Sequence, residues 1–598
     1  MPTFYPEIEI AKKSHQPLTE GELFFLDYLN STLSQSSEVF IQPMINGDQP
    51  DIVVLKKNHG LIIIEVKDWN LEYYKINSIT DWRIKSNNTE IKSPFYQVSE
   101  YRDNFIKLHI ERLYESYLKN KSSTKFIKCV LYFHNTSQQE LVKHIDYKKS
   151  NDILVLFRYD LNLYKIESLL SLIPGVTFSD DLYAKFRRYL QPPFHKIEEG
   201  IEINYTNQQK ELIRSVSAQR QKIKGLAGCG KTMVAAKRAV NAHIRTNSYV
   251  LILTYNLSLV NYIHDRINDV RENFYWKYFI ITNYHQFFKS HANNYGLPIN
   301  SLEPFSDVDY FEPMRYHITP FKAILVDEVQ DYQTSWLEII TKYFTDSETE
   351  FVVFGDEKQN IYNRPLDENK RPKIKTIPGR WNETLNISKR FTSNIGKIAL
   401  KFQKEFFDKK YSIDEIQIFE NPELDLHPQT IEYYYFNNKP LQSEFIKYYI
   451  DIVEKLDVHP SDIGILSAKV DYLRDLDKHI RYEMNEKTET TFETAEYYSK
   501  LKEEKNINTR NKIIENIRRN KKSHFYFKNG LSKLSTIHSF KGWEIHTLFL
   551  IIEDDEHTTG EIVYTGFTRA RVNLIIINFG NMKYHNFFND NIKVIHSI

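Results

Sequence analysis

Two carboxylates and a lysine lie at matching ends of two apolar runs near the start of the chain. Asp51 precedes IVVL, Glu65 follows LIII, and Lys67 comes two residues after Glu65. Because side chains alternate along a strand, Glu65 and Lys67 share a face. Carboxylates bind hard divalent ions, and such an ion activates water for attack on phosphate. The pattern predicts a phosphodiester-cleaving centre with Mg²⁺ or Mn²⁺, in which Asp51 and Glu65 are metal ligands.

The two apolar runs are expected to form the strands that position these groups. They are separated by KKNHG, residues 56–60, which is typical of a hairpin turn. Asp51 would then open the first strand while Glu65 closes the second, so both lie at one sheet edge. An ion pair at a strand end, with no chemistry, is the alternative interpretation of Glu65 and Lys67.

The spacing P-D-x13-E-x-K resembles that of restriction-endonuclease-like (PD-(D/E)xK) nucleases. Gln97 and Tyr101, at helical i,i+4 spacing, resemble the Q-x-x-x-Y motif of RecB-like nucleases. Asp68-Trp69, with Pro94 and Gln97, resembles the nuclease-related (NERD) domain over roughly residues 18–160. The resemblance implies a further acid at Glu22 on the first helix, and it implies the catalytic residues Asp51, Glu65, Lys67, Gln97 and Tyr101.

A second centre is indicated by GLAGCGKT, residues 225–232, which fits G-x-x-x-x-G-K-[ST]. Glycines at 225, 228 and 230 allow backbone N–H groups to close around phosphate oxygens, and the following helix adds its partial positive charge. Lys231 is expected to reach the β- and γ-phosphates, and Thr232 to bind Mg²⁺. The motif therefore predicts ATP binding, with Gly225, Gly228, Gly230, Lys231 and Thr232 as contacts.

A strand ending in two acids supports this prediction. AILVDEVQDYQ places Asp327 to hold the magnesium and Glu328 to orient and deprotonate the attacking water. Capping of the next helix is the alternative role for the pair. Gln359 is expected to sense the γ-phosphate, and the arginines Arg390 and Arg569 to stabilise the charge that develops on it.

The ordered set of motifs from about Tyr205 to the C-terminus resembles superfamily 1 helicases of the UvrD/Rep type, with DExQ in the Walker B segment. The resemblance implies that Gln209 reads adenine and that the motif STIHSFKGWE contributes Glu544 to the nucleotide site. It implies translocation on single-stranded DNA, which stacking rings and backbone contacts would hold without regard to base sequence. The residues expected at the strand are Thr254, Tyr255, Asn283, Tyr284, His285, Tyr362 and His538.

This chain also departs from the helicase pattern. About forty residues separate His285 from the Walker B strand, which leaves little room for the accessory insertion usual there. Ser388 and Lys389 stand where the family commonly has asparagine and tyrosine before Arg390. These departures bear on processive unwinding more than on ATP hydrolysis or translocation.

Composition limits the remaining possibilities. The two cysteines exclude a disulfide framework and a four-cysteine iron–sulfur cluster. The net charge of +1 shows no basic character overall, so any nucleic-acid groove must be local. The sequence lacks a secretory segment at its start and an apolar run of membrane-spanning length, which predicts a soluble, cytoplasmic protein without a membrane partner.

The chain is predicted to be a multidomain α/β protein, because 598 residues exceed one core. A restriction-endonuclease-like domain is expected over 1–190, ending before Pro192-Pro193. Two RecA-like P-loop domains with parallel sheets are expected over 200–375 and 376–598. A lysine-rich helical insertion at about 470–530 is either a solvated face or a DNA-contacting subdomain.

Together these features predict an ATP-dependent DNA nuclease–helicase that uses ATP and Mg²⁺. The arrangement resembles the bacterial nuclease–helicase immunity proteins, which implies action against phage DNA. A housekeeping repair or recombination enzyme is one alternative, and a non-cutting DNA-binding ATPase switch is another. RNA also stays open as a substrate, and the sequence identifies no protein partner.

Overall fold

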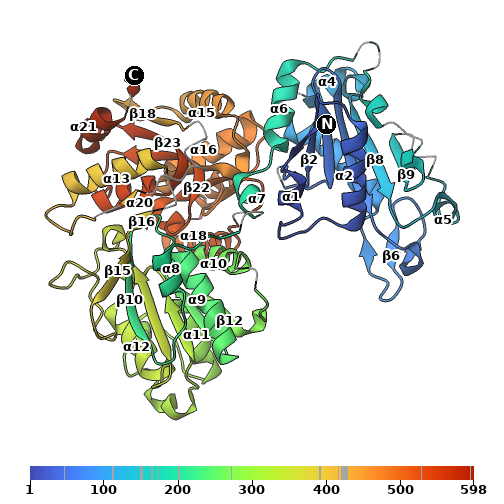
Figure 1. Ribbon diagram of the computed structural model, residues 1–598. Helices are drawn as coiled ribbons and strands as arrows, with labels where there is room; N and C mark the ends of the chain where they lie inside the picture. Colours follow the sequence, from blue (N-terminus) through green and yellow to red (C-terminus); the bar gives the residue numbers. More distant parts are fainter. Residues whose placement is uncertain are drawn as a thin grey trace.

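The computed structural model contains three α/β lobes, each built on its own sheet (Figure 1). It describes the whole chain except residues 46, 111–112, 148–151, 163–165, 173, 175, 200–201, 271, 389–391, 415–416, 419–428, 505, 527, 593 and 598. We call the lobes N-terminal (β1–β9), middle (β10–β15) and C-terminal (β18–β24). No helix within the described ranges is long and apolar enough to cross a membrane.

The N-terminal lobe has a six-stranded mixed sheet in the order β1-β2-β3-β4-β8-β9. Its strands are β1 (Thr3–Tyr5), β2 (Ser37–Ile41), β3 (Ile52–Lys56), β4 (Gly60–Lys67), β8 (Ile127–Phe133) and β9 (Ile153–Phe157). Its helices are α1 (Ile8–Ala11), α2 (Glu20–Thr32), α3 (Pro94–Asn104), α4 (Leu113–Lys119), α5 (Gln138–Val142) and α6 (Asp180–Leu190). A small antiparallel sheet, β5 (Tyr74–Ile76), β6 (Trp82–Ile84) and β7 (Glu90–Ile91), is inserted after β4.

The predicted hairpin is present, because β3 ends at Lys56 and antiparallel β4 begins at Gly60. The even-numbered side chains of this hairpin pack toward α2. The odd-numbered ones, such as Val53 and Ile63, pack in the cluster that includes α3. Since Ile52 pairs with Ile64, one further step along the register sets residue 51 opposite residue 65. The alternation therefore brings both acids to the α3 side of one sheet edge.

The middle lobe has a fully parallel sheet in the order β12-β11-β13-β14-β10-β15. The strands are β10 (Arg220–Gly225), β11 (Val250–Thr254), β12 (Phe279–Asn283), β13 (Ala323–Val326), β14 (Glu350–Gly355) and β15 (Trp381–Leu385). The helices are α8 (Asn207–Leu212), α9 (Lys231–Thr246), α10 (Leu259–Asn268), α11 (Tyr284–Asn294) and α12 (Thr334–Phe344). Parallel strands end at one sheet edge, so the segments after β10, β13 and β14 meet there.

The C-terminal lobe has a seven-stranded parallel sheet in the order β20-β21-β19-β22-β23-β18-β24. Its strands are β18 (Ile431–Phe436), β19 (Ile463–Ser467), β20 (Thr488–Thr490), β21 (Ser532–Thr536), β22 (Ile545–Glu553), β23 (Ala570–Phe579) and β24 (Val594–Ser597). Its helices include α13 (Ser393–Phe406), α15 (Gln442–Leu456), α16 (Val470–Glu483), α19 (Ile537–Phe540), α20 (Gly560–Phe567) and α21 (Met582–Asn591). Two short strands, β16 (Ile387–Ser388) and β17 (Gln417–Ile418), pair beside it.

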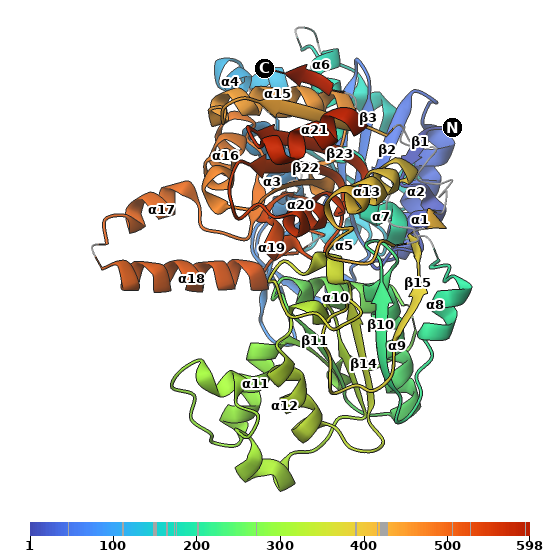
Figure 2. The ribbon, with the colours of Figure 1, turned by 90° about the vertical axis from the view of Figure 1, so that its left-hand side faces the viewer.

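The inserted helical segment is narrower than expected. Helix α16 packs on the C-terminal sheet through buried residues such as Leu473 and Ile480. Only α17 (Ala495–Leu501) and α18 (Ile507–Ser523) extend away from the lobe as an arm between β20 and β21 (Figure 2). Helix α18 buries a single residue, Ile514, so most of its lysines and arginines are at least partly accessible.

One apolar cluster of the C-terminal lobe extends into the middle lobe. Leu259 and Tyr262 of α10 belong to the same buried cluster as Phe540 and Trp543 of the C-terminal lobe. Gly542 makes this approach possible: it has φ +89°, and a Cβ there would lie 2.6 Å from the Leu259 side chain. The two lobes therefore meet as one packed body at the edge where the middle-lobe strands end.

The N-terminal lobe is joined to the C-terminal lobe by α6 and α7 (Phe194–Glu199), which lie between them in Figure 1. Arg188 of α6 donates to Glu486 Oε2 over 3.1 Å and to the carbonyl of Val458 over 3.2 Å. Glu486 is 1% exposed and also accepts from Tyr189 and Ser532. The adjacent pair between Arg187 and Asp457 is partly exposed.

Arg188→Ala is expected to lower the free energy of unfolding by about 3–5 kcal/mol, because the charge of Glu486 would stay buried without its ionic partner. Asp457→Asn removes the exposed pair at the same interface and is expected to cost only about 0–1 kcal/mol. Urea unfolding followed by fluorescence and circular dichroism measures both. Equal costs for the two substitutions would contradict this account of the interface.

Candidate active sites

The N-terminal centre lies at the C-terminal end of β4. Glu65 is fully buried, and its Oε1 accepts a hydrogen bond from Lys67 Nζ over 2.5 Å. Asp51, on the adjacent strand, accepts from the backbone N–H of Val66 over 2.7 Å. The geometry gathers the two predicted acids and the predicted lysine at one sheet edge.

Burial disfavours the charged forms of Asp51 and Glu65. Burial, and then the charge of Glu65, raise the pKa of Asp51 well above its ordinary value. Burial likewise raises the pKa of Glu65, although Lys67 opposes this. Two carboxylates in such a place favour binding a proton or a cation between them.

Helix α3 closes this centre from one side. Pro94 starts the helix, and Gln97 Nε2 donates to the Tyr101 hydroxyl over 3.0 Å. Tyr101 in turn donates to the carbonyl of Gln49 over 3.1 Å, two residues before Asp51. Burial and the charge of Glu65 raise the pKa of Tyr101, so its hydroxyl stays protonated and able to donate. Gln97 and Tyr101 are thus in direct contact on one helix, as their i,i+4 spacing allows.

The other residues expected near this centre are Glu22, Asp68 and Trp69. Glu22 forms a capping box with Thr19 at the start of α2, and its charge adds to the raised pKa of Asp51. Asp68 accepts from the N–H of Gly21 over 3.2 Å. Trp69 lies under the Lys67 ammonium, which is 5.2 Å from the ring centroid. Sequence reasoning found these residues, and the structure gives them positioning contacts.

A divalent ion fits the donors that are present. Glu65 Oε2 is buried and has no hydrogen-bond partner in the described part of the chain. No group of three or more His, Cys, Asp or Glu residues is arranged for a metal in that same part, so Asp51 and Glu65 would hold an ion together with water or phosphate oxygens. When bound, such an ion supplies an activated water and stabilises charge on the phosphate.

The second centre is formed by the loop between β10 and α9. Gly230 has φ +81° at the start of α9, a conformation that favours glycine. Lys231 Nζ donates to the carbonyls of Gly225 and Leu226 over 2.7 and 3.0 Å. Thr232 Oγ1 donates to Asp327 Oδ2 over 3.0 Å. The predicted phosphate-binding and magnesium-binding groups are therefore adjacent.

The two acids after β13 have different electrostatic environments. Burial, and then the charge of Glu328, raise the pKa of Asp327 to about 6. Burial alone would raise the pKa of Glu328, but Lys541 and Lys231 lower it. Glu328 is thus kept ionised, as a general base must be, while Asp327 favours a bound cation.

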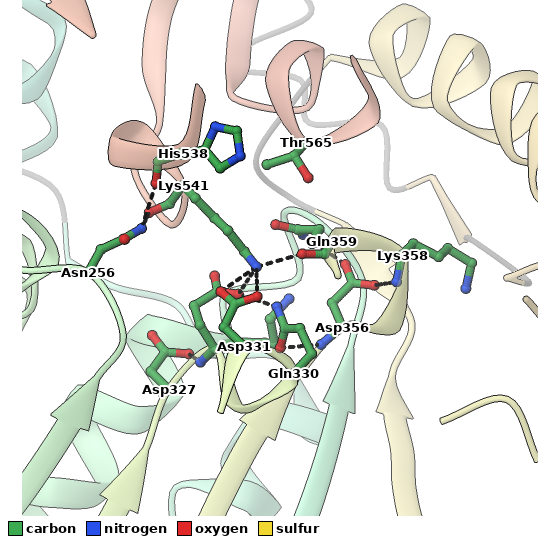
Figure 3. A network of polar contacts seen from close by, with 12 residues as sticks. Asn256, Asp327, Gln330, Asp331, Asp356, Lys358, Gln359, His538, Lys541 and Thr565 are labelled. Atoms are coloured by element: carbon green, nitrogen blue, oxygen red, sulfur yellow. Dashed lines mark hydrogen bonds and ion pairs between the residues drawn. The ribbon is translucent and has the colours of Figure 1, made fainter. Parts of the chain in front are cut away.

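The C-terminal lobe contributes two buried cations to this centre, Arg569 and Lys541, of which Figure 3 labels Lys541. Arg569 donates to Gln359 Oε1 over 3.0 Å and lines one cavity with Lys231, Thr232 and Glu328. Lys541 is fully buried and donates to both carboxylate oxygens of Asp331, over 2.8 and 2.7 Å, and to the carbonyl of Gln359 over 2.5 Å. The cavity therefore needs both lobes.

The other residues predicted to contact the nucleotide differ in where they lie relative to the cavity. Gln209 is buried and donates to the carbonyl of Cys229 over 3.0 Å, which ties α8 to the phosphate loop. Glu544 lies 3.9 Å from Arg571 and does not line the cavity with Gly542 and Arg569. Arg390 lies outside the described residues.

Aromatic side chains gather where the middle and C-terminal lobes meet. The rings of Tyr255 and Tyr362 are 4.8 Å apart, and Tyr362 lies 5.8 Å from His538 of the C-terminal lobe. Trp336 stacks on Tyr255 at 6.2 Å and meets the exposed ring of His285 at 4.8 Å. Three predicted nucleic-acid residues thus form one cluster that spans the lobe boundary, with His285 beside it.

Three other residues predicted to contact single-stranded DNA are buried or bonded inside the middle lobe, although the ring of Tyr284 stacks on Trp336 at 4.6 Å. Thr254 is fully buried, and Tyr284 is 1% exposed with its hydroxyl bound to the carbonyl of Phe305. Asn283 caps α11 by accepting from the N–H of Gln286 over 3.0 Å. Sequence reasoning missed Trp336 and Asp331, whose signal was their position just after the Walker B acids.

Comparisons with known proteins agree with the two centres. Residues 18–134 match the family model described as nuclease-related domain (NERD), and residues 208–365 match one described as AAA domain. The expected nuclease-related region and P-loop region are thereby confirmed. A search of curated proteins finds no match.

One solved structure similar to this chain is a complex of the Arterivirus nonstructural protein 10, a helicase, with DNA. The two share 11% identity, and the match covers 64% of this chain and 65% of that helicase, less than two thirds of its length. The TM-score is 0.27, which is too low to establish a shared fold. The specific resemblance to UvrD/Rep helicases stays a prediction.

Asp51→Asn is expected to raise the melting temperature of the metal-free protein at pH 7 while abolishing metal-dependent cutting. Asparagine keeps an acceptor for Val66 N–H and removes the repulsion from Glu65. A carboxyl whose pKa is raised by folding stabilises the fold when protonated, and this stability is lost as pH rises through the raised pKa. The gain over wild type should therefore shrink toward pH 4, near the unfolded-state pKa.

Thermal unfolding in chelator between pH 4 and pH 8 measures this difference. ATP hydrolysis serves as the control, because Asp51 lies in a different lobe from Lys231. A variant less stable than wild type at pH 7 would contradict the proposed repulsion between the two acids.

Proposed function

We propose that this protein is an ATP-dependent DNA nuclease–helicase of superfamily 1. The N-terminal lobe cleaves phosphodiester bonds with Asp51, Glu65 and Lys67 around Mg²⁺ or Mn²⁺. The middle and C-terminal lobes act as two RecA-like domains that hydrolyse ATP and move along single-stranded DNA. The observation that carries the proposal is that both sets of catalytic groups are assembled in one chain, each with the charge that its chemistry requires.

The nuclease assignment rests on the charge balance at β4. Lys67 already neutralises one oxygen of Glu65, and the second oxygen has no partner among the described groups. An ion pair with no chemistry would not need Asp51 directly opposite, where its pKa is raised by Glu65. Glu22 and the Tyr101 hydroxyl supply the polar environment in which water and phosphate can be oriented.

The motor assignment rests on the shared cavity. Lys231 and Thr232 come from the middle lobe, while Arg569 comes from the C-terminal lobe. A nucleotide bound there would contact both lobes, so its hydrolysis could change how they meet. The ring cluster of Tyr255, Tyr362 and His538 spans the same boundary and would respond to that change.

The nuclease and ATPase centres should be separable by substitution. End-labelled single- and double-stranded DNA would be incubated with wild type, Glu65→Ala and Lys231→Ala, with Mg²⁺, with and without ATP. Cutting should be lost in Glu65→Ala, which keeps ATPase activity, whereas Lys231→Ala should lose ATPase activity. A wild type that never cuts with Mg²⁺ or Mn²⁺, while hydrolysing ATP, would refute the nuclease assignment and leave a DNA-binding ATPase.

Tyr362→Ala should weaken binding of single-stranded DNA by about 1–3 kcal/mol, the range for loss of one base-stacking ring. Tyr362→Phe keeps the ring and should bind like wild type. Tyr316→Ala is the matched control, because that tyrosine is 96% exposed and lies outside the cluster. Fluorescence anisotropy with an oligothymidine probe measures all three. Unchanged binding by Tyr362→Ala would remove this cluster from the strand path.

The biological role is proposed to be defence against phage DNA. This rests on the resemblance to nuclease–helicase immunity proteins, in which the two activities are similarly fused. Expression of wild type should reduce phage plating, and the Glu65→Ala and Lys231→Ala variants should not. If deletion of the gene instead causes sensitivity to DNA damage without changing phage plating, the protein acts in repair.

A further inference from the structure

The segment that leads into Asp51 is held by α3 on one side. Tyr101 donates to the carbonyl of Gln49, and Asn104 Nδ2 donates to Asp48 Oδ2 over 2.7 Å. Ile45 and Asp48 exchange two backbone hydrogen bonds of 2.7 Å, which tie these two residues together. The position of Asp51 is therefore coupled to residues several positions before it.

Met44, which precedes Ile45, is held by the C-terminal lobe. His459 Nε2 lies 2.7 Å from the carbonyl oxygen of Met44. Gly530 of the same lobe also faces Met44, since a Cβ on that glycine would lie 3.5 Å from Met44 Cβ and from its carbonyl oxygen. Met44 thus contacts two separate loops of the C-terminal lobe.

His459 is a fixed donor in this contact. Its Nδ1 accepts from the N–H of Ser461 over 3.0 Å, so the ring proton is on Nε2 and points to Met44. The ring is 2% exposed, and burial lowers the pKa of His459 to about 3. The ring is therefore neutral near neutral pH, and the contact does not depend on its protonation.

The start and end of the segment are also tied together. The N–H of Gln42 donates to the carbonyl of Asp51 over 2.8 Å, which closes the segment where β2 and β3 diverge. Ile45 is fully buried in the core cluster shared with α3. A displacement of Met44 would therefore reach the backbone of Asp51 through the bonds of Gln42 with Asp51 and of Ile45 with Asp48.

We propose that His459 is a positioning residue for the nuclease centre, supplied by the lobe that also contributes Arg569 to the nucleotide cavity. It acts through the Met44 carbonyl and the segment before Asp51, so the nuclease centre is completed by docking of the N-terminal lobe on the C-terminal lobe. This inference rests on the proposed nuclease function and extends it, because it assigns the motor part a structural share in cutting.

The test uses the full-length chain with His459→Ala and His459→Gln, cutting single-stranded DNA with Mg²⁺. His459→Ala should lower kcat about ten-fold or more, since small displacements of catalytic groups cost this much. KM for DNA and ATP hydrolysis should stay unchanged. Glutamine retains an N–H donor and should restore kcat, which a simple loss of packing would not allow. Asp457→Asn, on the same loop but without contact to Met44, is the matched control and should cut like wild type.

Hydrogen–deuterium exchange on the same proteins gives a readout independent of cutting. The peptide covering residues 42–51 should exchange faster in His459→Ala than in wild type or Asp457→Asn, while the 52–67 hairpin should not change. Wild-type kcat in His459→Ala, or unchanged exchange of the 42–51 peptide, would overturn the proposal. If wild type never cuts, the nuclease function fails, and the exchange result alone decides whether His459 supports this segment.

Discussion

Buried charges that find their partners in another lobe are the constraint on which this structure depends. Arg188 of the N-terminal lobe is paired with Glu486 of the C-terminal lobe, and Lys541 of the C-terminal lobe is paired with Asp331 of the middle lobe. Breaking a buried pair costs about 3–5 kcal/mol, because one charge then stays in a poorly solvated place. The lobes are therefore held in a defined arrangement, in which the cavity at the P-loop is lined by residues of two lobes.

At the end of β4, stability and the proposed function make opposite demands on Asp51 and Glu65. The core of the N-terminal lobe would be more stable without two acids facing each other across β3 and β4, since burial and mutual repulsion raise the pKa of Asp51. A site that awaits a cation is expected to carry this cost. At the P-loop the arrangement differs, because Lys231 and Lys541 already compensate Glu328, and Thr232 faces Asp327. The charges of the acids are thus balanced in different ways at the two centres.

Features that follow from strand alternation, helical spacing or parallel strand order were predictable from the sequence. The hairpin at residues 56–60, the i,i+4 contact of Gln97 with Tyr101 and the meeting of Thr232 with Asp327 follow from alternation, helical spacing and parallel strands. Contacts that depend on docking between lobes were not. Nothing near His459 in the sequence points to Met44, 415 residues away.

Burial also decided several aromatic and polar positions that motif reasoning could not. Tyr284 and Tyr255 both occur in motif segments, yet Tyr284 is 1% exposed with its hydroxyl bound and stacks on Trp336 from within the middle lobe, while Tyr255 faces Tyr362. Glu544 turns toward Arg571 because that arginine links the segment to Glu198 of α7. Such choices depend on how each side chain packs in the folded protein, which a single segment does not encode.

Anomalous diffraction from crystals grown with Mn²⁺ and a non-hydrolysable ATP analogue would show whether both proposed centres bind a divalent cation. We expect one anomalous peak between Asp51 and Glu65 and a second beside Thr232 and Asp327. A peak beside Thr232 and Asp327, with Lys67 paired to Glu65 and no peak between the two N-terminal acids, would contradict this expectation.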